Sequence, residues 1–479
     1  MTRETPRLGA KIRALRRRDQ LTQVQLAQRL EISPSYLNLI ESNRRPLPAP
    51  MLIKLAQIFH ADLEAFGTDE EGKLISNLLE AFSDPLFEAY GLSAQEMREM
   101  VTTSPSLARA VLALYHAYQS QQRAGELLAS QIAAGEDAIG ADERVPTEEV
   151  NDLIQKHRNH FPGLESAAEE LWGKARLDEG QIAAGLARYL EQAHRVQVRV
   201  MRRTEAKGAL RRFNAEQRLL MLSELLPTRS RAFQLAHQIA LLEHHDALER
   251  VAGDALLTSE EARALARVTL ANYFAGAVLM PYLPFLRAAR EERYDIEVIG
   301  RRFAVGFEQV CHRLTTLSRP GAAGIPLHML RIDVAGNISK RFSASGLQFA
   351  RFSGACPKWN VFAAFMTPGL LRVQVSRMPD GATYFCIART VQNDSGGYHA
   401  QPPVQVIGLG CQVQYASEMV YSDGIDLTNL GSAVPVGVTC RACQRTDCEQ
   451  RAFPSLRHRL QVDENVRGVS LYVPIPPGG

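Results

Sequence analysis

Hydrophobic residues recur every three to four positions along most of this chain, and they alternate with polar residues only in its last third. The first spacing is typical of helices with one buried face, and the second of strands with one buried face. The helical pattern gives two short helices within residues 21–41, and the region from residue 70 to about 315 looks almost wholly helical. From about residue 325 the alternating pattern predicts short strands.

Turn-forming residues separate the predicted strands. Ala335-Gly336-Asn337 and Pro379-Asp380-Gly381 follow apolar segments, as glycine-containing turns do at strand ends. The predicted strands are residues 327–334, 370–377, 382–391, 404–407 and 469–473. Together they predict an α/β ligand-binding domain over residues 320–479.

The two helices within residues 21–41 carry capping residues at both starts. Thr22 is a candidate N-cap, and Gln25 three positions later completes a capping box. Ser33 can cap the second helix, with Pro34 at its first position, where the missing N–H of proline costs nothing. This order of cap, helix, tight turn and capped helix predicts a helix-turn-helix domain. A generic small helical bundle is the alternative.

The second helix would present its N-terminal end to bases in the major groove of DNA. The candidate DNA contacts on and around that end are Thr22, Gln23, Ser33, Ser35, Tyr36, Asn38, Arg44 and Arg45. Residues 1–60 contain eleven Lys/Arg and four Asp/Glu, whereas the formal charge of the whole chain is only +3. A basic module on a slightly acidic body is typical of phosphate binding, which disfavours the generic bundle. Further phosphate candidates are Arg16, Arg17 and Arg18.

These residues resemble the Cro/repressor-type (XRE) helix-turn-helix family, which implies binding to a duplex DNA operator. One departure is Glu31, which stands in the turn where the family usually has glycine. If this position needs a positive φ, a glutamate there costs roughly 1 kcal/mol.

Composition places the chain among globular proteins of several domains. Contents of 46% hydrophobic and 22% charged residues are ordinary, and 479 residues suffice for about three domains. The sequence has no run of 18 apolar residues and no signal-peptide pattern, so we expect a cytoplasmic location and no membrane partner. The seven cysteines do not indicate a disulfide framework in a reducing compartment.

The pattern divides the chain into four expected segments. They are an all-α helix-turn-helix domain over residues 1–67, a helical linker or dimerisation segment over 68–134, a helical domain over 146–318 and the α/β domain over 320–479. Residues 135–146 are polar without helical periodicity and predict a linker. The long helix over residues 106–134 is either a solvated packing helix or the seam of a homodimer, and the sequence does not decide between them.

Two segments of the middle region resemble the zincin-like domain of the M78 peptidase family. Residues 231–241 stand where that family has an H-E-x-x-H helix, and 270–281 resemble its second metal-site helix. Zinc catalysis needs two histidines one turn apart, a third ligand and a glutamate base. Only His237 is retained, because Gln238 and Leu241 replace the glutamate and the second histidine.

Leu270 stands where that resemblance implies an acidic ligand, so we expect a degenerate scaffold and no enzyme. Two disfavoured alternatives stay open at this point. His244 and His245 follow His237 by seven and eight positions and could improvise a zinc site with it. The chain could also be an active metalloprotease that cleaves a partner repressor.

Three cysteines near the C-terminus have the spacing C-x2-C-x4-C. Cys440, Cys443 and Cys448 can reach one centre, with Cys356 as the candidate fourth ligand. An iron–sulfur cluster, a zinc ion and reduced thiols without metal are all compatible with this spacing. The remaining cysteines, Cys311, Cys386 and Cys411, lie in apolar surroundings and are expected in the core.

The combination of these three regions resembles the short-chain fatty acyl-CoA regulator family. Residues 354–361 and 440–454, which carry these cysteines, support this resemblance, and the second segment is its most specific element. The resemblance implies a bacterial transcription factor of propionate and acetate metabolism whose C-terminal domain binds an acyl-CoA. It also implies that some members carry an iron–sulfur cluster.

Coenzyme A carries three phosphates, so its site needs several cations, ideally arginines. The strand region supplies Arg331, Lys340, Arg341, Arg351, Lys358, Arg377 and Arg389. Arg351 and Arg389 are the first candidates because each lies in an apolar segment, where a charge must find a partner. Aromatic candidates for contact with adenine or the acyl chain are Trp359, Phe349 and Phe352.

The sequence therefore predicts a cytoplasmic regulator that binds a palindromic operator as a homodimer and responds to a short-chain acyl-CoA. The first alternative is a redox or iron sensor that uses the cluster at Cys440, Cys443 and Cys448. The sequence predicts neither the acyl chain length nor whether the protein activates or represses.

Overall fold

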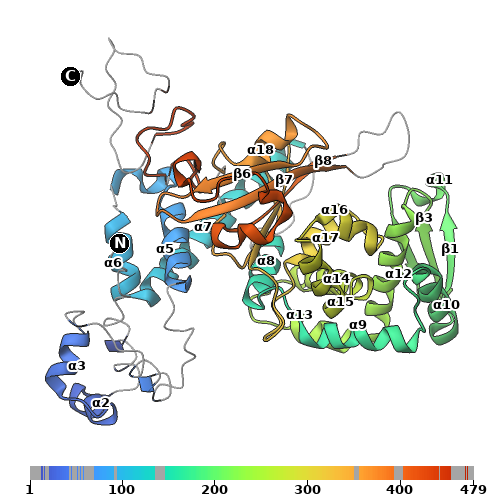
Figure 1. The fold of residues 1–479 in the computed structure, drawn as a ribbon, viewed down its shortest axis with the longest axis horizontal. Helices are drawn as coiled ribbons and strands as arrows, with labels where there is room; N and C mark the ends of the chain where they lie inside the picture. Colours follow the sequence, from blue (N-terminus) through green and yellow to red (C-terminus); the bar gives the residue numbers. More distant parts are fainter. Residues whose placement is uncertain are drawn as a thin grey trace. The chain divides into compact units, whose positions relative to one another are not determined.

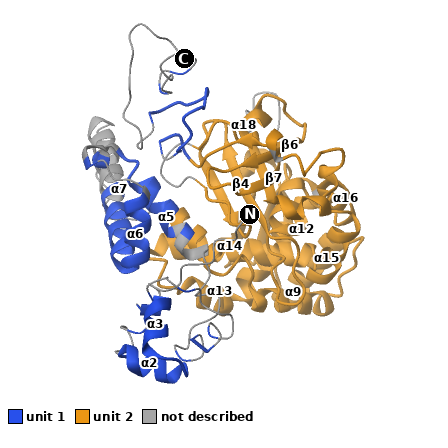
Figure 2. Ribbon diagram, turned by 60° about the vertical axis from the view of Figure 1, so that its left-hand side comes forward, with its two compact units in different colours: residues 1–119, 350–353, 439–479 blue, residues 120–349, 354–438 orange. Residues whose placement is uncertain are grey.

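A computed structural model describes most of the chain. The described residues are 12–13, 16, 21–41, 45, 51, 54–55, 58, 69–90, 94–134, 146–349, 355–392, 403–441, 443–454, 470 and 472. The chain divides into two compact units (Figure 2). The first comprises residues 1–119, 350–353 and 439–479, and the second comprises residues 120–349 and 354–438.

The first unit begins with the two predicted helices, α2 (Gln23–Arg29) and α3 (Pro34–Glu41). The Thr22 N–H donates to Gln25 Oε1 over 2.8 Å, and the Gln25 N–H donates to Thr22 Oγ1 over 3.2 Å, so the predicted capping box is present. Ser33 Oγ accepts from the Tyr36 N–H over 3.1 Å at the start of α3. These side chains satisfy N–H groups that have no partner inside the helix.

The helices pack around an apolar core whose described members include Ile12, Leu26, Ala27, Leu30, Leu37, Ile40 and Leu55. Val24 follows the same spacing, but its side chain is 60% exposed. Glu31 in the turn has φ +59°, the conformation for which the family uses glycine. Lys54 donates to its carboxylate over 2.8 Å.

The rest of the first unit contains a second helical cluster. Its elements are α5 (Asp69–Ala81), the 3-10 helix η2 (Pro85–Tyr90), α6 (Ala94–Thr103) and the start of α7 (Pro105–Ala134). On α7, Ala108, Leu112 and Tyr115 recur one turn apart and are buried in this cluster. Tyr115 also donates from its hydroxyl to Asp84 over 2.9 Å.

The second unit contains a large group of helices between residues 146 and 314 (Figure 1). They are α8 (Pro146–Lys156), α9 (Pro162–Lys174), α10 (Ile182–His194), α11 (Arg203–Ala206), α12 (Thr228–Glu243), α13 (His245–Ala252), α14 (Glu260–Leu279), α15 (Tyr282–Glu291), α16 (Ile296–Arg302) and α17 (Phe307–Leu314). The central helix is α14, which is buried along much of its length and packs against α8, α9, α12 and α13.

A small sheet interrupts the region that the sequence predicted to be almost wholly helical. Its strands are β1 (Gln197–Met201), β2 (Arg211–Asn214) and β3 (Leu219–Ser223), in the order β1-β3-β2. The prediction was wrong here because the strands are only four or five residues long and β1 and β2 carry arginines. Alternation over so few residues is a weak signal beside the longer helical pattern.

The larger sheet has six strands in the order β5-β4-β8-β7-β6-β9. They are β4 (Leu327–Asp333), β5 (Ile338–Ser343), β6 (Arg372–Arg377), β7 (Thr383–Gln392), β8 (Val404–Gln412) and β9 (Val434–Pro435). All neighbours are antiparallel except β6 and β9. Four of the predicted strands match β4, β6, β7 and β8, whereas β5 was not predicted. The predicted strand 469–473 lies outside the described residues except for Ser470 and Tyr472, which are not in a strand.

One helix, α18 (Asn360–Phe365), packs on β6, β7 and β8. Its close approach requires a glycine on β8. A Cβ atom on Gly408 would lie 2.7 Å from Val361 Cγ1, closer than real contacts allow.

The helices and the larger sheet share one hydrophobic core. Buried residues from Phe161 to Met419 form a single apolar cluster that joins α9, α12, α14 and α17 to β4, β7 and β8. The domain boundary predicted near residue 319 stays a prediction, but the chain on its two sides packs together.

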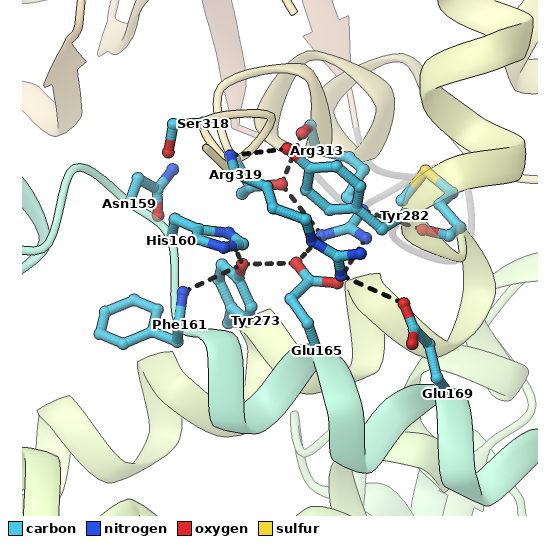
Figure 3. A network of polar contacts seen from close by, with 12 residues as sticks. Asn159, His160, Phe161, Glu165, Glu169, Tyr273, Tyr282, Arg313, Ser318 and Arg319 are labelled. Atoms are coloured by element: carbon cyan, nitrogen blue, oxygen red, sulfur yellow. Dashed lines mark hydrogen bonds and ion pairs between the residues drawn. The ribbon is translucent and has the colours of Figure 1, made fainter. Parts of the chain in front are cut away.

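A buried ion pair links three of these helices (Figure 3). Arg313 on α17 donates to both oxygens of Glu165 on α9, over 2.6 and 2.9 Å, and neither side chain is more than 2% exposed. The Tyr273 hydroxyl on α14 donates to the same carboxylate over 2.5 Å. Arg313 Nε donates to the Met280 carbonyl over 2.9 Å, so both charges have several hydrogen bonds.

No single helix among the described residues is long and apolar enough to cross a membrane. The pair α14 and α15 passes that test together by length and composition but is bent by 67°.

We predict that Glu165→Gln lowers the free energy of unfolding of the second unit by roughly 3 kcal/mol, because it leaves the Arg313 charge buried without its counter-ion. Both tryptophans of the chain, Trp172 and Trp359, lie in this unit. Urea denaturation followed by tryptophan fluorescence therefore measures it directly.

The matched control is Glu169→Gln, which breaks a half-exposed pair with Arg319 and should cost less than about 1 kcal/mol. Burial raises the pKa of Glu165, but the Arg313 charge and the hydrogen bonds from Arg313 and Tyr273 outweigh it and lower the pKa. Stability from this carboxylate is present above its unfolded pKa and is lost as the pH falls through its folded pKa. The wild type should therefore lose more stability than Glu165→Gln as the pH falls below about 4.5, and equal losses would contradict the assignment.

Candidate functional site

The exposed end of the helix-turn-helix domain carries most of the predicted DNA contacts that the structure describes. Thr22, Ser33, Ser35 and Asn38 are exposed, and Tyr36 is half-buried. The exposed Arg45 lies with its guanidinium carbon 5.8 Å from the centre of the Tyr36 ring. This arrangement leaves hydroxyl, amide and guanidinium groups on one side of α3.

Two predicted contacts are engaged inside the domain. Glu41, 2% exposed at the end of α3, accepts from Arg16 over 2.6 and 3.1 Å and from the Gln23 amide over 2.8 Å. Burial raises the Glu41 pKa, but these hydrogen bonds and the charges of Arg16 and Arg13 bring it below its usual range. Arg16 therefore stabilises the domain and is not free for phosphate. The candidates Arg17, Arg18 and Arg44 lie outside the described residues.

The second unit contains a cavity of about 450 Å³ between α8, α14 and α17 and the strands β4 and β5. Its wall includes the apolar residues Val150, Ile154, Phe233, Leu265, Val268, Met280, Met329 and Phe342. Its polar lining includes Asn159, Tyr273, Thr315 and Thr316, so the buried ion pair lies behind one wall. A largely apolar pocket with a few polar groups is the usual form of a small-molecule site.

One residue that lines this cavity has a buried hydrogen-bond acceptor without a partner. Asn159 is 1% exposed, and its Nδ2 donates to Thr315 Oγ1 over 2.8 Å. Its Oδ1 is buried and accepts no hydrogen bond from any described residue. An unsatisfied buried acceptor is costly. A ligand N–H can satisfy it only if the Asn159 side chain turns toward the cavity.

Predicted ligand contacts Lys340 and Arg341 both line this cavity, together with Arg331. Lys340 and Arg331 contact Glu308 of α17 at 3.1 and 2.9 Å, and Arg341 pairs with Glu148 of α8. Burial raises the pKa of Glu308, but the two cations lower it below its usual value. Three cations and two carboxylates of the described residues therefore meet at this end of the cavity.

Other predicted ligand contacts lie elsewhere. Arg389 pairs with Glu297 of α16 and stacks on Phe307. Its expected partner is therefore a carboxylate of the protein itself and not a ligand phosphate. Trp359 is 6% exposed, donates to the Gly437 carbonyl over 3.0 Å and borders a cavity of only about 20 Å³. Trp359 is therefore part of the core. Arg351 lies outside the described residues.

The remnant of the M78-like site holds His237 without metal partners. His237 Nδ1 lies 2.8 Å from Asn272 Oδ1, and its Nε2 is buried with no partner among the described residues. Burial, and then the charge of Arg211 on β2, lower the His237 pKa to about 4. A guanidinium beside this imidazole repels a metal cation.

His244 and His245 do not join His237 on one helix. Helix α12 ends at Glu243, and His244 is the break before α13. The His245 side chain is 64% exposed and faces Glu249 at 3.7 Å. Among the described residues, no group of three or more His, Cys, Asp or Glu side chains is arranged to hold a metal ion.

The three clustered cysteines are half-buried in the first unit, in a segment without helices or strands. Arg451, 6% exposed, donates to the backbone carbonyls of Cys440 and Cys443 over 2.7 and 3.0 Å and so fixes the loop. Cys356 is buried in the other unit. As described, these thiols do not form a ligand set, and a cluster at Cys440, Cys443 and Cys448 stays a prediction.

Three family descriptions match consecutive parts of the sequence. Residues 7–66 match "Helix-turn-helix domain", residues 191–315 match "IrrE N-terminal-like domain" of the M78 peptidases, and residues 316–472 match "Short-chain fatty acyl coenzyme A regulator, C-terminal". All three regions were predicted from the sequence.

Curated relatives match over nearly their full length. The chain is 40% identical to a "Propionyl-CoA carboxylase regulator" of Cereibacter sphaeroides, over 97% of this chain and 98% of that protein. It is 38% identical to the "HTH-type transcriptional regulator PrpR" of Mycobacterium tuberculosis, over 95% and 93% of the two chains. "HTH-type transcriptional regulator RamB" of the same species is 37% identical over 97% and 98%.

A solved structure, described as a Mycobacterium tuberculosis transcriptional regulator, superposes with a TM-score of 0.66 and 42% identity. It covers 69% of this chain and 100% of its own. With these matches over its whole length, the chain belongs to the family of helix-turn-helix transcriptional regulators that carry the short-chain fatty acyl-coenzyme A regulator domain.

Proposed function

We propose that this chain is a cytoplasmic transcriptional regulator whose effector, a short-chain acyl-CoA, binds in the cavity between α8, α14, α17 and β4–β5. The largely apolar cavity with Arg331, Lys340 and Arg341 in its wall is the observation that carries this assignment. The pantetheine arm of an acyl-CoA offers amide groups to the polar side chains of the lining, such as Thr315 and Thr316. A short acyl chain suits the surrounding apolar side chains.

The cavity volume fits part of the effector and leaves the rest outside. About 450 Å³ is within the range of roughly 300–1,000 Å³ for small-molecule sites. It holds an acyl group and a pantetheine arm but not the nucleotide as well. The phosphates then lie at the rim near Lys340 and Arg341, whose side chains are 46% and 11% exposed.

Effector binding would exchange ion pairs. Lys340 and Arg341 are paired with Glu308 and Glu148 in the structure, so phosphates must displace these carboxylates. Glu148 is on the first turn of α8, the helix that follows α7 in the chain. We propose that the effector shifts α8 in this way and thereby changes the arrangement of two DNA-binding domains, which links effector and operator affinity.

We also propose that the chain forms a homodimer through α7. The side chains of Leu107, Leu114 and Tyr118 are 55%, 73% and 39% exposed on this helix, at spacings of seven and four residues. They form a stripe about 100° around the helix from the buried Ala108, Leu112 and Tyr115. A heptad-like stripe of this kind is typical of a helix that packs against a second copy.

We propose that the chain does not act as a peptidase. Gln238 and Leu270 are buried at the positions where the related peptidases need a base and a ligand. The imidazole of His237 bonds Asn272 instead.

We predict that Lys340→Gln and Arg341→Gln each weaken propionyl-CoA binding about tenfold, because a charge-assisted hydrogen bond to phosphate is worth roughly 1.5–3 kcal/mol. Isothermal calorimetry with the full chain measures this affinity. Arg287→Gln, an exposed charge on α15 away from the cavity, is the control and should bind as the wild type does. Absence of binding of every short acyl-CoA to the wild type would refute the proposed effector.

Negative charges introduced on the α7 stripe should break the homodimer. Leu107→Glu/Leu114→Glu places four carboxylates in the proposed seam, and light scattering coupled to size exclusion should then show a monomer. Ala113→Glu/Ala117→Glu adds the same charge at exposed positions on another face of α7 and should stay dimeric. A wild-type monomer, or equal masses for the two variants, would place the dimer contact elsewhere or exclude it.

The DNA-binding face makes two distinguishable contributions. Asn38→Ala should weaken operator binding by about 1–3 kcal/mol if it contacts a base edge, and the salt dependence should not change. Arg45→Gln should weaken binding to every sequence and reduce the slope of log K against log salt by about 1. Fluorescence anisotropy at several salt concentrations separates these effects. Identical behaviour of the two variants would contradict the division into base and phosphate contacts.

A further inference from the structure

We propose that the small sheet of the second unit is a second DNA-binding surface, which contacts the phosphate backbone of duplex DNA outside the sequence bound by the helix-turn-helix domain. We call it the basic face, and its members are Arg195, Arg199, Arg202, Arg203, Lys207, Arg212 and Arg218. The inference rests on the DNA binding of this family and adds a contact from a different part of the chain.

Charge is unusually concentrated in this segment. Residues 195–218 contain eight Lys/Arg and only two Asp/Glu. All seven members of the basic face are exposed. The eighth cation, Arg211, points to the inner side of the sheet, where burial lowers its pKa. This cluster was not predicted, because the longer helical pattern around it dominates the segment in the sequence.

Strand register places arginines of two strands in one row. Arg199 of β1 is paired with Met221 of β3, and Met221 is paired with Arg212 of β2. Residues opposite each other on neighbouring strands share a face, so both arginines project from the same side, about 10 Å apart across two strand spacings. The α11 turn adds Arg202 and Lys207 at one end, and Arg195 and Arg218 flank the other.

Few of these charges are neutralised within the protein. Arg199 lies 3.5 Å from Glu205, and both side chains are more than half exposed, so this pair is weak. Arg212 donates to the Ala206 carbonyl over 3.4 Å, which leaves its charge intact. No described carboxylate pairs with Arg195, Arg202, Lys207 or Arg218. Cations that outnumber the carboxylates around them on an exposed sheet attract a polyanion.

The form of the basic face favours duplex DNA over other anions. It is an open sheet surface and borders neither of the two cavities described above. It carries no exposed aromatic side chain, which single-stranded nucleic acids need for stacking. Because both surfaces belong to one chain, a duplex bound by the helix-turn-helix domain is tethered to the basic face, so even weak backbone contacts become effective through high local concentration.

The test compares two DNA lengths in the full chain. Arg199→Gln/Arg202→Gln/Arg212→Gln/Arg218→Gln neutralises the basic face, and Arg250→Gln/Arg263→Gln/Arg287→Gln/Arg301→Gln removes four exposed charges from α13–α16 as the matched control. The probes are fluorescein-labelled random-sequence duplexes of 20 and 60 base pairs, and the readout is the slope of log K against log salt. Tryptophan fluorescence in urea checks that both variants fold.

We expect the neutralised variant to bind the 60-base-pair duplex with a slope reduced by roughly 0.9 for each lost phosphate contact, and to match the wild type on the 20-base-pair duplex. The control variant should match the wild type on both. Equal slopes for the wild type and the neutralised variant on the long duplex would overturn the inference.

Two further results would also overturn it, for different reasons. Loss of coenzyme A binding by the neutralised variant, with unchanged DNA binding, would assign the basic face to the effector. Failure of the wild type to bind either duplex would contradict the proposed function itself, and the second surface with it.

Discussion

The buried pair between Glu165 and Arg313 is the interaction on which the second unit depends. Both charges are removed from water, and neither is tolerable alone in this interior. Glu165 belongs to α9, Arg313 to α17 and the third partner Tyr273 to α14, so the hydrogen bonds fix three helices in one relative arrangement. An apolar contact of the same area would allow these helices to slide, whereas directed hydrogen bonds to two charges do not.

The cavity follows from that arrangement. Arg313 and Tyr273 line it from the helical side, and β4 and β5 close it from the sheet side. Because a single core joins helices and sheet, a molecule in the cavity touches both the M78-like region and the region matched to acyl-CoA regulators. In the region matched to the M78 peptidases, Asn272 hydrogen-bonds His237, and the charge of Arg211 lowers the pKa of this histidine further.

Local features were predictable from the sequence, and long-range partners were not. Thr22, Gln25 and Ser33 act within three residues of their own positions, so the capping of the DNA-binding helices and the positive φ at Glu31 could be anticipated. The turns at Gly336 and Gly381 are local in the same sense.

Arginine roles depended on residues far away in the chain. Arg389 was expected to need a partner, and the structure gives it Glu297, 92 positions away. Arg389 does not line the cavity. Arg16 is engaged by Glu41, 25 positions away, and Lys340 reaches the cavity only because β5 pairs with β4. Asn159 had no sequence signal at all, because an unpartnered amide oxygen is a property of the folded surroundings.

Hydrogen–deuterium exchange of the full chain with and without propionyl-CoA tests the central claim most directly. If the effector occupies the cavity, exchange should slow in α8, α14, α17 and β5, whose residues line it. It should stay unchanged in β6 and α18. In the strand order, β6 is separated from β4 and β5 by β8 and β7, and neither β6 nor α18 lines the cavity. Protection confined to α18 and β6, or to the strands β1–β3, would contradict the cavity as the effector site.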